Sequence, residues 1–485
     1  LRKPGMKTIL KISNALLLLG IILLAYHLGS PSARGRVELG DNPANEFIRG
    51  DSNDDGILNI SDAVFMLSFL FLGDEQPECL AATDANDDGT ANITDVILVL
   101  NFLFMGSDVP AAPFPEPGED PTPDLGCRED PLPYLPPAGS LGGPDRDLND
   151  VESLSWRRGR LIFDDFFSTT VGLGPLFNGD SCRGCHLTPI IGGAGGLDVD
   201  VVRFARLEEN GEVVQLESGP AVSRLSIHGI SRDEVNSEAN IIETRQTPSL
   251  LGLGMIDRLP REAILANADP ADADGDGISG RAPELNGRIG RFGHKAGVPS
   301  LQDFCADALI NEMGITVNGD LADFAVGVDA DSVNDPEIPD QDFIDLVFFT
   351  SHLAPPPRTF PQDASLRARI GKGEENFIEI GCASCHVSSL AGAEGPVEAY
   401  SDFLLHDVAD PERLNVPEGD AEPSEFRTAP LWGLRFTGPY MHDGAAETAR
   451  DAILLHFGEA TAAKTAFLSL NFDEQSKLIE FLLSL

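Results

Sequence analysis

Cys182-Arg-Gly-Cys185-His186 and Cys382-Ala-Ser-Cys385-His386 are two copies of one short pattern, C-x-x-C-H, placed 200 residues apart. The two thiols of such a pattern form thioethers with the vinyl groups of a haem, and the adjacent His binds the iron on its proximal side. The sequence has no further C-x-x-C pair to complete a zinc site. The motifs therefore predict two covalently bound haems c, each in its own half-domain, and a mainly α fold.

The stretches that follow the two motifs resemble each other. Arg245-Gln-Thr-Pro248 follows the first motif, and Arg427-Thr-Ala-Pro430 follows the second. Later in the second half, a predicted helix places His456 on the same face as Ala452, because the two residues are four positions apart. We therefore expect His456 to be the sixth ligand of the second haem iron, with Met441 as the alternative.

The first half offers no equally strong ligand at the matching position. Two alignments of the halves are possible, Arg261–Leu265 with Arg450–Leu454 or Phe292–His294 with Tyr440–His442. The former places Asn267 opposite His456, and the latter places Ala308 there. Neither side chain is a strong iron ligand, so we expect the haems to differ. One would be closed and suited to electron transfer, and the other would have an open or displaceable position.

The composition is strongly acidic. The chain of 485 residues has 78 acidic and 34 basic residues, which gives a formal net charge of −44. Binding to nucleic-acid phosphates requires clusters of Lys and Arg, and this sequence has none, so we exclude a nucleic-acid partner. An excess of carboxylates suits a protein that holds hard cations.

Two Asp- and Asn-rich loops begin 33 residues apart, at Asp51 and Asp84. The expected Ca2+ ligands at loop positions 1, 3, 5, 7, 9 and 12 are Asp51, Asn53, Asp55, Ile57, Asn59 and Asp62 in the first loop and Asp84, Asn86, Asp88, Thr90, Asn92 and Asp95 in the second. The residue at position 7 would bind through its backbone carbonyl, and Gly56 and Gly89 supply the sharp turn at position 6. The two loops predict a pair of calcium sites.

The repeat pair resembles a dockerin module. Apolar runs over 63–72 and 96–104 follow the loops and would pack them together, and position 12 is Asp rather than Glu. We assign residues 44–108 to this dockerin-like calcium-binding module. The resemblance implies attachment of the chain to a cohesin-like partner rather than chemistry.

The first residues have the features of a secretory signal peptide, which we assign to 1–33. Lys7 and Lys11 precede the apolar run 15–25, and small residues follow at 29–33. The run is shorter than the roughly 20 residues of a membrane span. We therefore expect an exported protein, periplasmic or extracellular, held at a membrane only if this segment stays uncleaved.

A proline-rich stretch separates the module from the rest of the chain. Residues 109–144 contain eleven prolines, which is typical of a semi-rigid linker. Cys127 in this linker and Cys79 between the calcium loops could form a disulfide in an oxidising compartment. We assign 145–350 to the first haem half-domain and 351–485 to the second.

Residues 145–485 resemble the di-haem oxidoreductases, often called thiol oxidoreductases, of the bacterial di-haem cytochrome c peroxidase superfamily. The matching stretches are Gly172–Asn178, Cys182–His186, Ala271–Arg281, Gly290–Ala296, Leu404–Asp407 and Pro439–Gly444, together with His456. The resemblance implies two cytochrome c-like half-domains and an oxidoreductase that reduces peroxide. A donor protein or a small reductant would deliver electrons to haem 2, and haem 1 would be the site of the chemistry.

The resemblance also suggests roles around haem 1. Glu312 matches the catalytic Glu of the peroxidases, if a two-residue deletion is allowed, and would move a proton between the oxygens of peroxide. His294 stands where those enzymes have Trp, and Phe304 stands where they have Gln. His228 resembles their displaceable distal His ligand of haem 1. In the peroxidases the position matching His456 is usually Met.

A third acidic turn lies between the two motifs. Asp272, Asp274 and Asp276 precede Gly277, but Pro283 occupies the position of the last ligand. The peroxidases hold calcium between their halves, so the resemblance suggests a calcium site at this turn.

Three functions are compatible with these motifs. The first is an exported di-haem oxidoreductase with an exchangeable haem 1. The second is a non-catalytic di-haem electron-transfer cytochrome, with two six-coordinate irons, anchored through its dockerin-like module. The third is a scaffold component whose main role lies in the calcium module. We favour the first, because a simple electron carrier has no evident need for two unequal haem sites.

Overall fold

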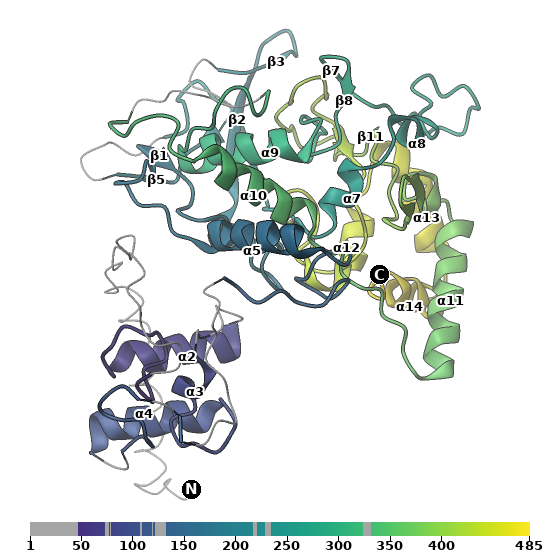
Figure 1. Ribbon diagram of the computed structural model, residues 1–485. Coiled ribbons are helices and arrows are strands. Elements are labelled where there is room, and N and C mark those ends of the chain that lie inside the picture. The colour runs from purple at the N-terminus through teal and green to yellow at the C-terminus, as the bar shows by residue number, and fades with distance from the viewer. Residues whose placement is uncertain are drawn as a thin grey trace, which may run out of the picture. The chain divides into compact units, whose positions relative to one another are not determined.

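The computed structural model describes residues 47–72, 77, 79–106, 109–118, 120–121, 132–216, 221–227, 234–323 and 331–485 (Figure 1). The chain divides into two compact units, Leu1–Pro133 and Tyr134–Leu485. The predicted signal segment lies outside the described residues. Within the described part, no helix is both long and apolar enough to cross a membrane.

The first unit is a small helical module built around the two acidic loops. Its helices are α2 (Ile60–Leu72), α3 (Leu80–Thr83) and α4 (Ile93–Met105). Met66 of α2 and Val96 and Val99 of α4 form its apolar core. Cys79 is disulfide-bonded, the other five described cysteines are free, and Cys127 lies outside the described residues.

Two helix pairs form the framework of the second unit. In the first pair, α5 (Asp150–Asp164) packs against α10 (Asp340–Ser351), and in the second, α11 (Ala364–Glu379) packs against α14 (Phe472–Leu482) (Figure 1). Each pair meets at a glycine. A Cβ on Gly159 would lie 1.9 Å from the carbonyl oxygen of Asp345, and a Cβ on Gly373 would lie 2.0 Å from that of Lys477. Only glycine permits so close an approach of the two backbones.

The same aromatic contact follows each glycine. Phe163 of α5 meets Phe349 of α10 edge-to-face with ring centroids 5.2 Å apart, and Phe377 of α11 meets Phe481 of α14 in the same way at 5.3 Å. The centroids of Phe163 and Phe377 each lie 6.3 Å from the imidazole of a C-x-x-C-H motif. The two helix pairs are therefore repeats of one arrangement, and each places its aromatic contact beside the motif's His.

The prediction of a mainly α fold is wrong, because the second unit also contains many strands. The largest sheet joins β2 (Val201–Leu207) to β3 (Val213–Val214), β4 (Ala221–Val222) and β6 (Ile241–Arg245). Two-stranded ladders pair β1 (Leu176–Phe177) with β5 (Leu225–Ser226), β7 (Glu284–Leu285) with β8 (Arg288–Ile289), β9 (Leu390–Gly392) with β10 (Gly395–Val397) and β11 (Leu405–Asp407) with β12 (Glu425–Arg427). Most of these strands have two or three residues, which is too short for a period-two pattern to show in the sequence.

Short helices complete the second unit. They are α6 (Cys182–Cys185), α7 (Leu253–Asp257), α8 (Arg261–Leu265), α9 (Leu301–Ala308), the π-helical segment η2 (Leu309–Met313), α12 (Ala449–Leu454), α13 (Thr461–Ser469) and the 3-10 turns η1 (Leu197–Val199), η3 (Cys382–Ser384), η4 (Leu434–Phe436) and η5 (Gly458–Ala460). One apolar core surrounds α5 and α10 and includes Trp156 and Phe349, and a second surrounds α11 and α14 and includes Phe377 and Phe481.

Candidate haem sites

Both C-x-x-C-H motifs fold into a single tight turn. The first forms α6, which Ser181 caps by accepting a hydrogen bond from the backbone N–H of Gly184. The second forms η3. In each motif the backbone N–H of the His donates to the carbonyl of the first Cys, at 3.0 Å for His186 and 3.1 Å for His386. This turn holds two thiols and one imidazole close together, as covalent attachment of a haem requires.

The two motif imidazoles have the same orientation and protonation. Nδ1 of His186 lies 3.2 Å from the carbonyl oxygen of Gly193, and Nδ1 of His386 lies 2.8 Å from that of Tyr400. A carbonyl oxygen only accepts, so each Nδ1 carries the hydrogen and Nε2 keeps its lone pair for iron. Burial lowers the pKa of both imidazoles to about 4, which keeps them neutral.

A cavity of about 630 Å³ adjoins the second motif. Its lining includes Cys382, Cys385 and His386, the apolar side chains Phe377, Ile453, Leu478 and Leu482, and both expected sixth ligands, Met441 and His456. A largely apolar cavity with two thiols and a neutral imidazole provides the donors and surroundings that haem c needs. The residues present therefore fit the cofactor that the second motif predicts.

His456 lines this cavity, but it lies two residues beyond the end of α12, so the prediction that a helix carries it is wrong. Its Nδ1 lies 2.7 Å from the carbonyl oxygen of Ala452, which leaves Nε2 as the ligating atom. Burial lowers the pKa of His456. His386 and His456 both line the cavity. Met441 adopts a left-handed backbone conformation with φ of +74°.

Two loops reveal how the halves align. The loop 292–298 is closed by backbone hydrogen bonds of 2.9 and 3.3 Å between its end residues, and the loop 440–446 by equivalent bonds of 2.7 and 3.2 Å. Backbone φ is positive at the second residue of each loop, Gly293 and Met441, and again at the fifth residue of each. The two loops are therefore copies of one structure in one register.

The helices that follow these loops keep the same register. Ser300 caps α9 by accepting from the N–H of Asp303, and Thr448 caps α12 by accepting from the N–H of Asp451. Each cap lies eight residues after the first residue of its loop. The structure thus selects the alignment of Phe292–His294 with Tyr440–His442, which places Ala308 at the position of His456. A methyl group cannot bind iron.

Glu312 lies beside the first motif. It belongs to η2, which continues α9, and Nδ2 of Asn178 donates to its Oε2 at 2.6 Å. The backbone N–H of Gly179 donates to the carbonyl of Glu312 at 3.3 Å, and a Cβ on Gly179 would lie 3.4 Å from Sγ of Cys185. The charge of Glu312 also raises the pKa of the Cys185 thiol, after the larger effect of burial. Burial also raises the pKa of Glu312 itself, although the hydrogen bond from Asn178 opposes the rise.

His294 lies elsewhere, on the cavity of the second motif. Its Nε2 lies 3.0 Å from the carbonyl oxygen of Gln246, and burial lowers its pKa to about 4. The ring centroids of His294 and His442, which match each other in the repeat, are 6.5 Å apart. Phe304 also lines this cavity. His228 lies outside the described residues.

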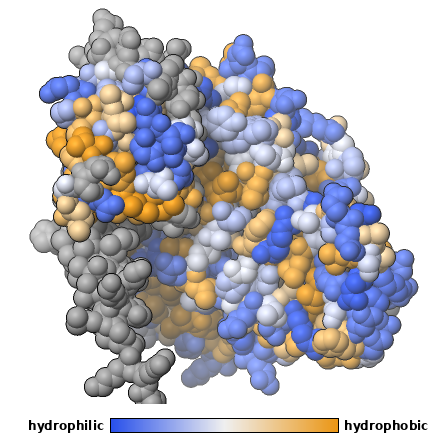
Figure 2. All heavy atoms as spheres, turned by 90° about the horizontal axis from the view of Figure 1, so that it is seen from below, coloured by the Kyte–Doolittle hydropathy of each residue, from blue (hydrophilic) through white to orange (hydrophobic). Residues whose placement is uncertain are grey.

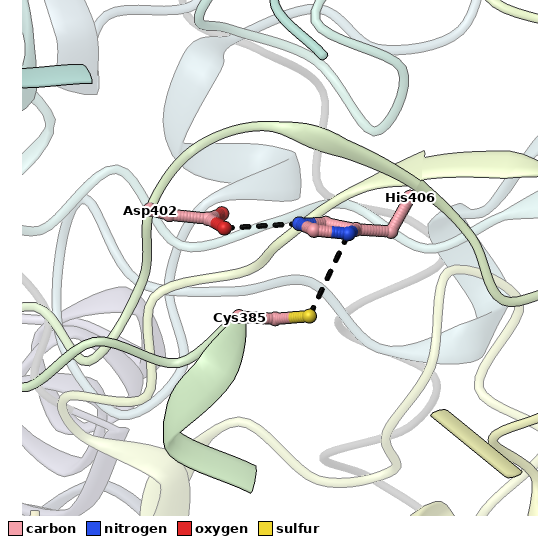
Figure 3. Close-up of side chains that lie close together, drawn as sticks. All are labelled: Cys385, Asp402 and His406. Carbon is pink, nitrogen blue, oxygen red and sulfur yellow. Dashed lines mark hydrogen bonds and ion pairs between the residues drawn. The ribbon is translucent and has the colours of Figure 1, made fainter. Parts of the chain in front are cut away.

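The imidazole of His406 lies between Asp402 and Cys385 (Figure 3). Nε2 of His406 lies 2.9 Å from Oδ2 of Asp402, and Nδ1 lies 2.8 Å from Oε2 of Glu459 and 3.6 Å from Sγ of Cys385. Burial opposes protonation, but the hydrogen bonds that the His406 ring donates to Asp402, Cys385 and Glu459 raise its pKa to about 12. The sequence analysis placed His406 within the matching stretch Leu404–Asp407 but did not identify its two carboxylate partners. Neither Asp402 nor Glu459 has a spacing from His406 that predicts the contact, because Asp402 lies in a loop and Glu459 is 53 residues away.

The acidic loops bring their carboxylates together. In the first loop, Oδ2 of Asp51 accepts from the N–H of Gly56 at 2.8 Å, and Oδ1 of Asp62 accepts from the N–H of Ser52 at 3.0 Å. Burial raises the pKa of Asp62 to about 7 and that of its counterpart Asp95 to about 6. A bound cation would stabilise the charged form of carboxylates buried in this way.

The third acidic turn also brings its side chains together. One oxygen from each of Asp272, Asp274 and Asp276 lies within 4.8 Å of the others, and the latter two residues are exposed. The turn is tied to the rest of the second unit through Ser279, whose hydroxyl donates to Oε1 of Glu459 at 2.5 Å.

Both C-x-x-C-H motifs are typical of haem-binding oxidoreductases, and comparison with known families agrees with this class. The family described as "Di-haem oxidoreductase, putative peroxidase" matches residues 229–485, and the dockerin type I domain matches residues 49–104. The chain belongs to the di-haem oxidoreductase family and carries a dockerin type I region. Both predicted resemblances are therefore confirmed.

Two curated relatives have the same name. The chain is 31% identical over 133 residues to cytochrome c551 peroxidase of Pseudomonas aeruginosa, covering 25% of this chain and 35% of the relative. It is 28% identical over 116 residues to cytochrome c551 peroxidase of Nitrosomonas europaea, covering 24% and 33%. The chain thus spans about a third of the length of each. The names support haem c as the cofactor and a peroxidase-like oxidoreductase class.

Two solved structures show weak similarity. Hydrazine synthase of Kuenenia stuttgartiensis aligns with a TM-score of 0.35 and 14% identity, over 74% of this chain and 99% of that one. A MauG-like protein associated with microbial copper homeostasis aligns with a TM-score of 0.34 and 14% identity, over 74% and 94%.

Proposed function

We propose that the protein is an exported di-haem c peroxidase. Haem 1 would be attached through Cys182 and Cys185 with His186 on its iron, and haem 2 through Cys382 and Cys385 with its own motif His. The haems supply the redox chemistry, and the surrounding residues supply ligands, protons and access. Electrons from a donor protein or a small reductant would enter at haem 2 and pass to haem 1.

The unequal repeat carries this proposal. At the position where the second half presents His456, the first half presents Ala308, so the end of α9 offers haem 1 no imidazole there. One turn further along, the first half places the buried carboxyl of Glu312 beside Cys185. An open coordination position next to a buried acid is what a peroxide-reducing site requires.

Glu312 is the proposed general acid–base. Its burial raises its pKa toward the working range of such a group, and Asn178 fixes the position of its Oε2. It would accept a proton from one peroxide oxygen and return it to the other as the O–O bond breaks.

Haem 2 is the proposed electron-transfer site. With His386 and His456 as its two ligands, its iron would have no vacant position. A His ligand in place of Met lowers the reduction potential of a haem. His294 and His442, 6.5 Å apart between ring centroids, are the proposed residues between the two haem sites.

The first unit is the proposed tether. Its loops would bind two calcium ions through the twelve ligands predicted from the sequence, and Asp272, Asp274 and Asp276 would form a further site in the second unit. Exposed apolar residues of the module are Ile57, Ile93, Ile97, Phe104 and Met105, and Figure 2 shows hydrophobic side chains at its surface. A cohesin-like partner is the proposed occupant of this surface.

The test is haem content followed by turnover. We expect two haems c per purified chain and catalytic oxidation of a reduced donor by hydrogen peroxide. A variant with Cys182 and Cys185 replaced by Ala should keep one haem and lose turnover. Two haems without any peroxide turnover would instead assign the chain to the electron-transfer cytochromes.

A further inference from the structure

Arg427, the last residue of β12, places a positive charge on the cavity of the second motif. Its Nε donates to the carbonyl of Gly293 at 3.0 Å, its Nη1 donates to the carbonyl of Thr428 at 3.1 Å, and its guanidinium lies over the ring of Phe403. These contacts fix the guanidinium in place without neutralising it. Burial lowers the pKa of Arg427 to about 10, as expected for a cation with too little negative charge near it.

In the first half, the positive charge of the matching arginine is neutralised by carboxylates. Arg245 also ends a strand, β6, and also begins an Arg-x-x-Pro sequence. Its Nε lies 2.8 Å from Oε1 of Glu243, and its Nη1 pairs with Glu418. Within the described part of the chain, by contrast, no carboxylate oxygen lies within the 4.0 Å of an ion pair from Arg427.

The carboxylate that acts most strongly on Arg427 is already engaged. Asp402 raises the pKa of Arg427, but its Oδ2 bonds to His406 and its Oδ1 accepts from the backbone N–H of Leu404. The facing imidazole of His294 has a pKa of about 4 and is neutral. A buried charge is normally paired because an unpaired one is costly. The cavity is therefore short of one negative charge beside Arg427.

We infer that Arg427 binds a carboxylate inside this cavity, namely a propionate of haem 2. This inference rests on the proposed function, which places haem 2 in the cavity. The propionates are the anionic groups of a haem, and a guanidinium binds a carboxylate through two parallel N–H···O bonds. Arg427 is thus a positioning residue that holds haem 2 and sets its reduction potential, whereas the equivalent Arg245 has become part of an ion-pair network.

The experiment is a redox titration of haem 2 in the full-length holoprotein, dialysed into a buffer without carboxylates. Arg427→Gln removes the charge, and Arg427→Lys keeps it without the bidentate geometry. Lys464→Gln is the matched control, because Lys464 lines the same cavity and donates to the carbonyl of Leu454. Haem content and the far-ultraviolet circular dichroism of each variant establish that it folds and binds both haems.

We expect the wild-type midpoint potential to be nearly independent of pH between about pH 5 and about pH 8, because the guanidinium keeps the propionate ionised. In Arg427→Gln the potential should fall and become pH-dependent. At a fixed solution potential and at about pH 8, the ferric-to-ferrous ratio of haem 2 should be at least about tenfold higher in this variant than in the wild type. A tenfold change corresponds to a fall in midpoint potential of about 59 mV for one electron. Arg427→Lys should recover most of the potential, and Lys464→Gln should not acquire the pH dependence.

Three outcomes would overturn the inference. If Arg427→Gln keeps the wild-type potential and pH profile, Arg427 does not bind a propionate. If Lys464→Gln reproduces its effect, the cause is the general field of the cavity. If the wild-type potential shifts only when acetate is added, and Arg427→Gln abolishes that shift, the bound carboxylate is an external anion. A wild-type chain that lacks haem 2 would instead overturn the proposed function.

Discussion

In the first haem half-domain, α9 passes Ala308 and continues into a π-helical segment that carries Glu312, whereas in the second, α12 ends at Leu454 and His456 follows. Around these helices the halves agree closely. Gly159 and Gly373 make equivalent backbone contacts, and both motif imidazoles donate through Nδ1 to a carbonyl.

Under the proposed function, this difference means that one scaffold presents two coordination environments. The proximal side, with its helix pair, aromatic contact and C-x-x-C-H turn, is duplicated. The distal side changes at one position of the repeat, which is the last residue of α9 in the first half and lies beyond the end of α12 in the second. Substitutions on the distal side should remove this difference, and substitutions in the duplicated parts should have equivalent effects in the two halves.

The largest effect is expected from Glu312→Gln. This change keeps the side-chain size and the hydrogen-bonding capacity toward Asn178 but removes the group that exchanges a proton, so kcat for peroxide should fall by about 10²–10⁴-fold. Steady-state turnover measures the loss. Glu375→Gln, at an exposed position on α11, is the control and should retain full activity. Undiminished turnover in Glu312→Gln would exclude Glu312 as the general acid–base.

Ala308→His should make the halves alike. An imidazole at this position would bind the iron of haem 1 in the way proposed for His456 at haem 2, which would convert haem 1 to a low-spin, six-coordinate state. If the new ligand is bound in about nine of ten molecules, about a tenth of the turnover should remain. Optical and EPR spectra report the conversion. Ala308→Val, which cannot bind iron, should leave the spin state of haem 1 unchanged.

Gly159→Ala and Gly373→Ala test the equivalence of the two helix pairs. Each new Cβ would collide with a carbonyl oxygen, so each variant should lose about 1–3 kcal/mol of unfolding free energy. Gly371→Ala on α11 is the control, because nothing lies within 4 Å of its Cβ and it should be neutral or slightly stabilising. Chemical denaturation measures all three. A large loss in only one of the two glycine variants would contradict the equivalence.

The smallest effect is a shift in a pH profile. Glu312 must be ionised to accept a proton, so turnover should be lost as the pH falls through its pKa. Burial raises that pKa, and the acid limb should therefore lie above the value of about 4.3 for a free Glu. The hydrogen bond from Asn178 lowers the pKa, so Asn178→Ala should move the limb to higher pH. An unmoved limb would show that another group controls it.

The covalent chemistry was the part most accessible from sequence. Short continuous stretches of sequence were enough to identify both C-x-x-C-H motifs, both acidic loops and the family resemblance. The Arg-x-x-Pro sequences that begin at Arg245 and Arg427 were recognised in the same way. The fold class was not accessible, because strands such as β1 and β12 have two or three residues and arise from tertiary contacts.

The site was only partly accessible for the same reason. The sequence left two alignments of the halves open, and only the matched loops and caps of the structure select Ala308 over Asn267. His406 pairs with Glu459, which is 53 positions away in the sequence. Arg427 donates to Gly293, which is 134 positions away and belongs to the other half-domain. Such contacts leave no local pattern.

The most direct test of the unequal repeat is low-temperature EPR of the holoprotein, fully oxidised and half-reduced, with and without cyanide. We predict one low-spin haem that cyanide never alters, which is haem 2, and one haem that is high-spin, or that cyanide converts in the half-reduced state, which is haem 1. Two low-spin signals that stay unchanged in every state would contradict the account and leave an electron-transfer cytochrome.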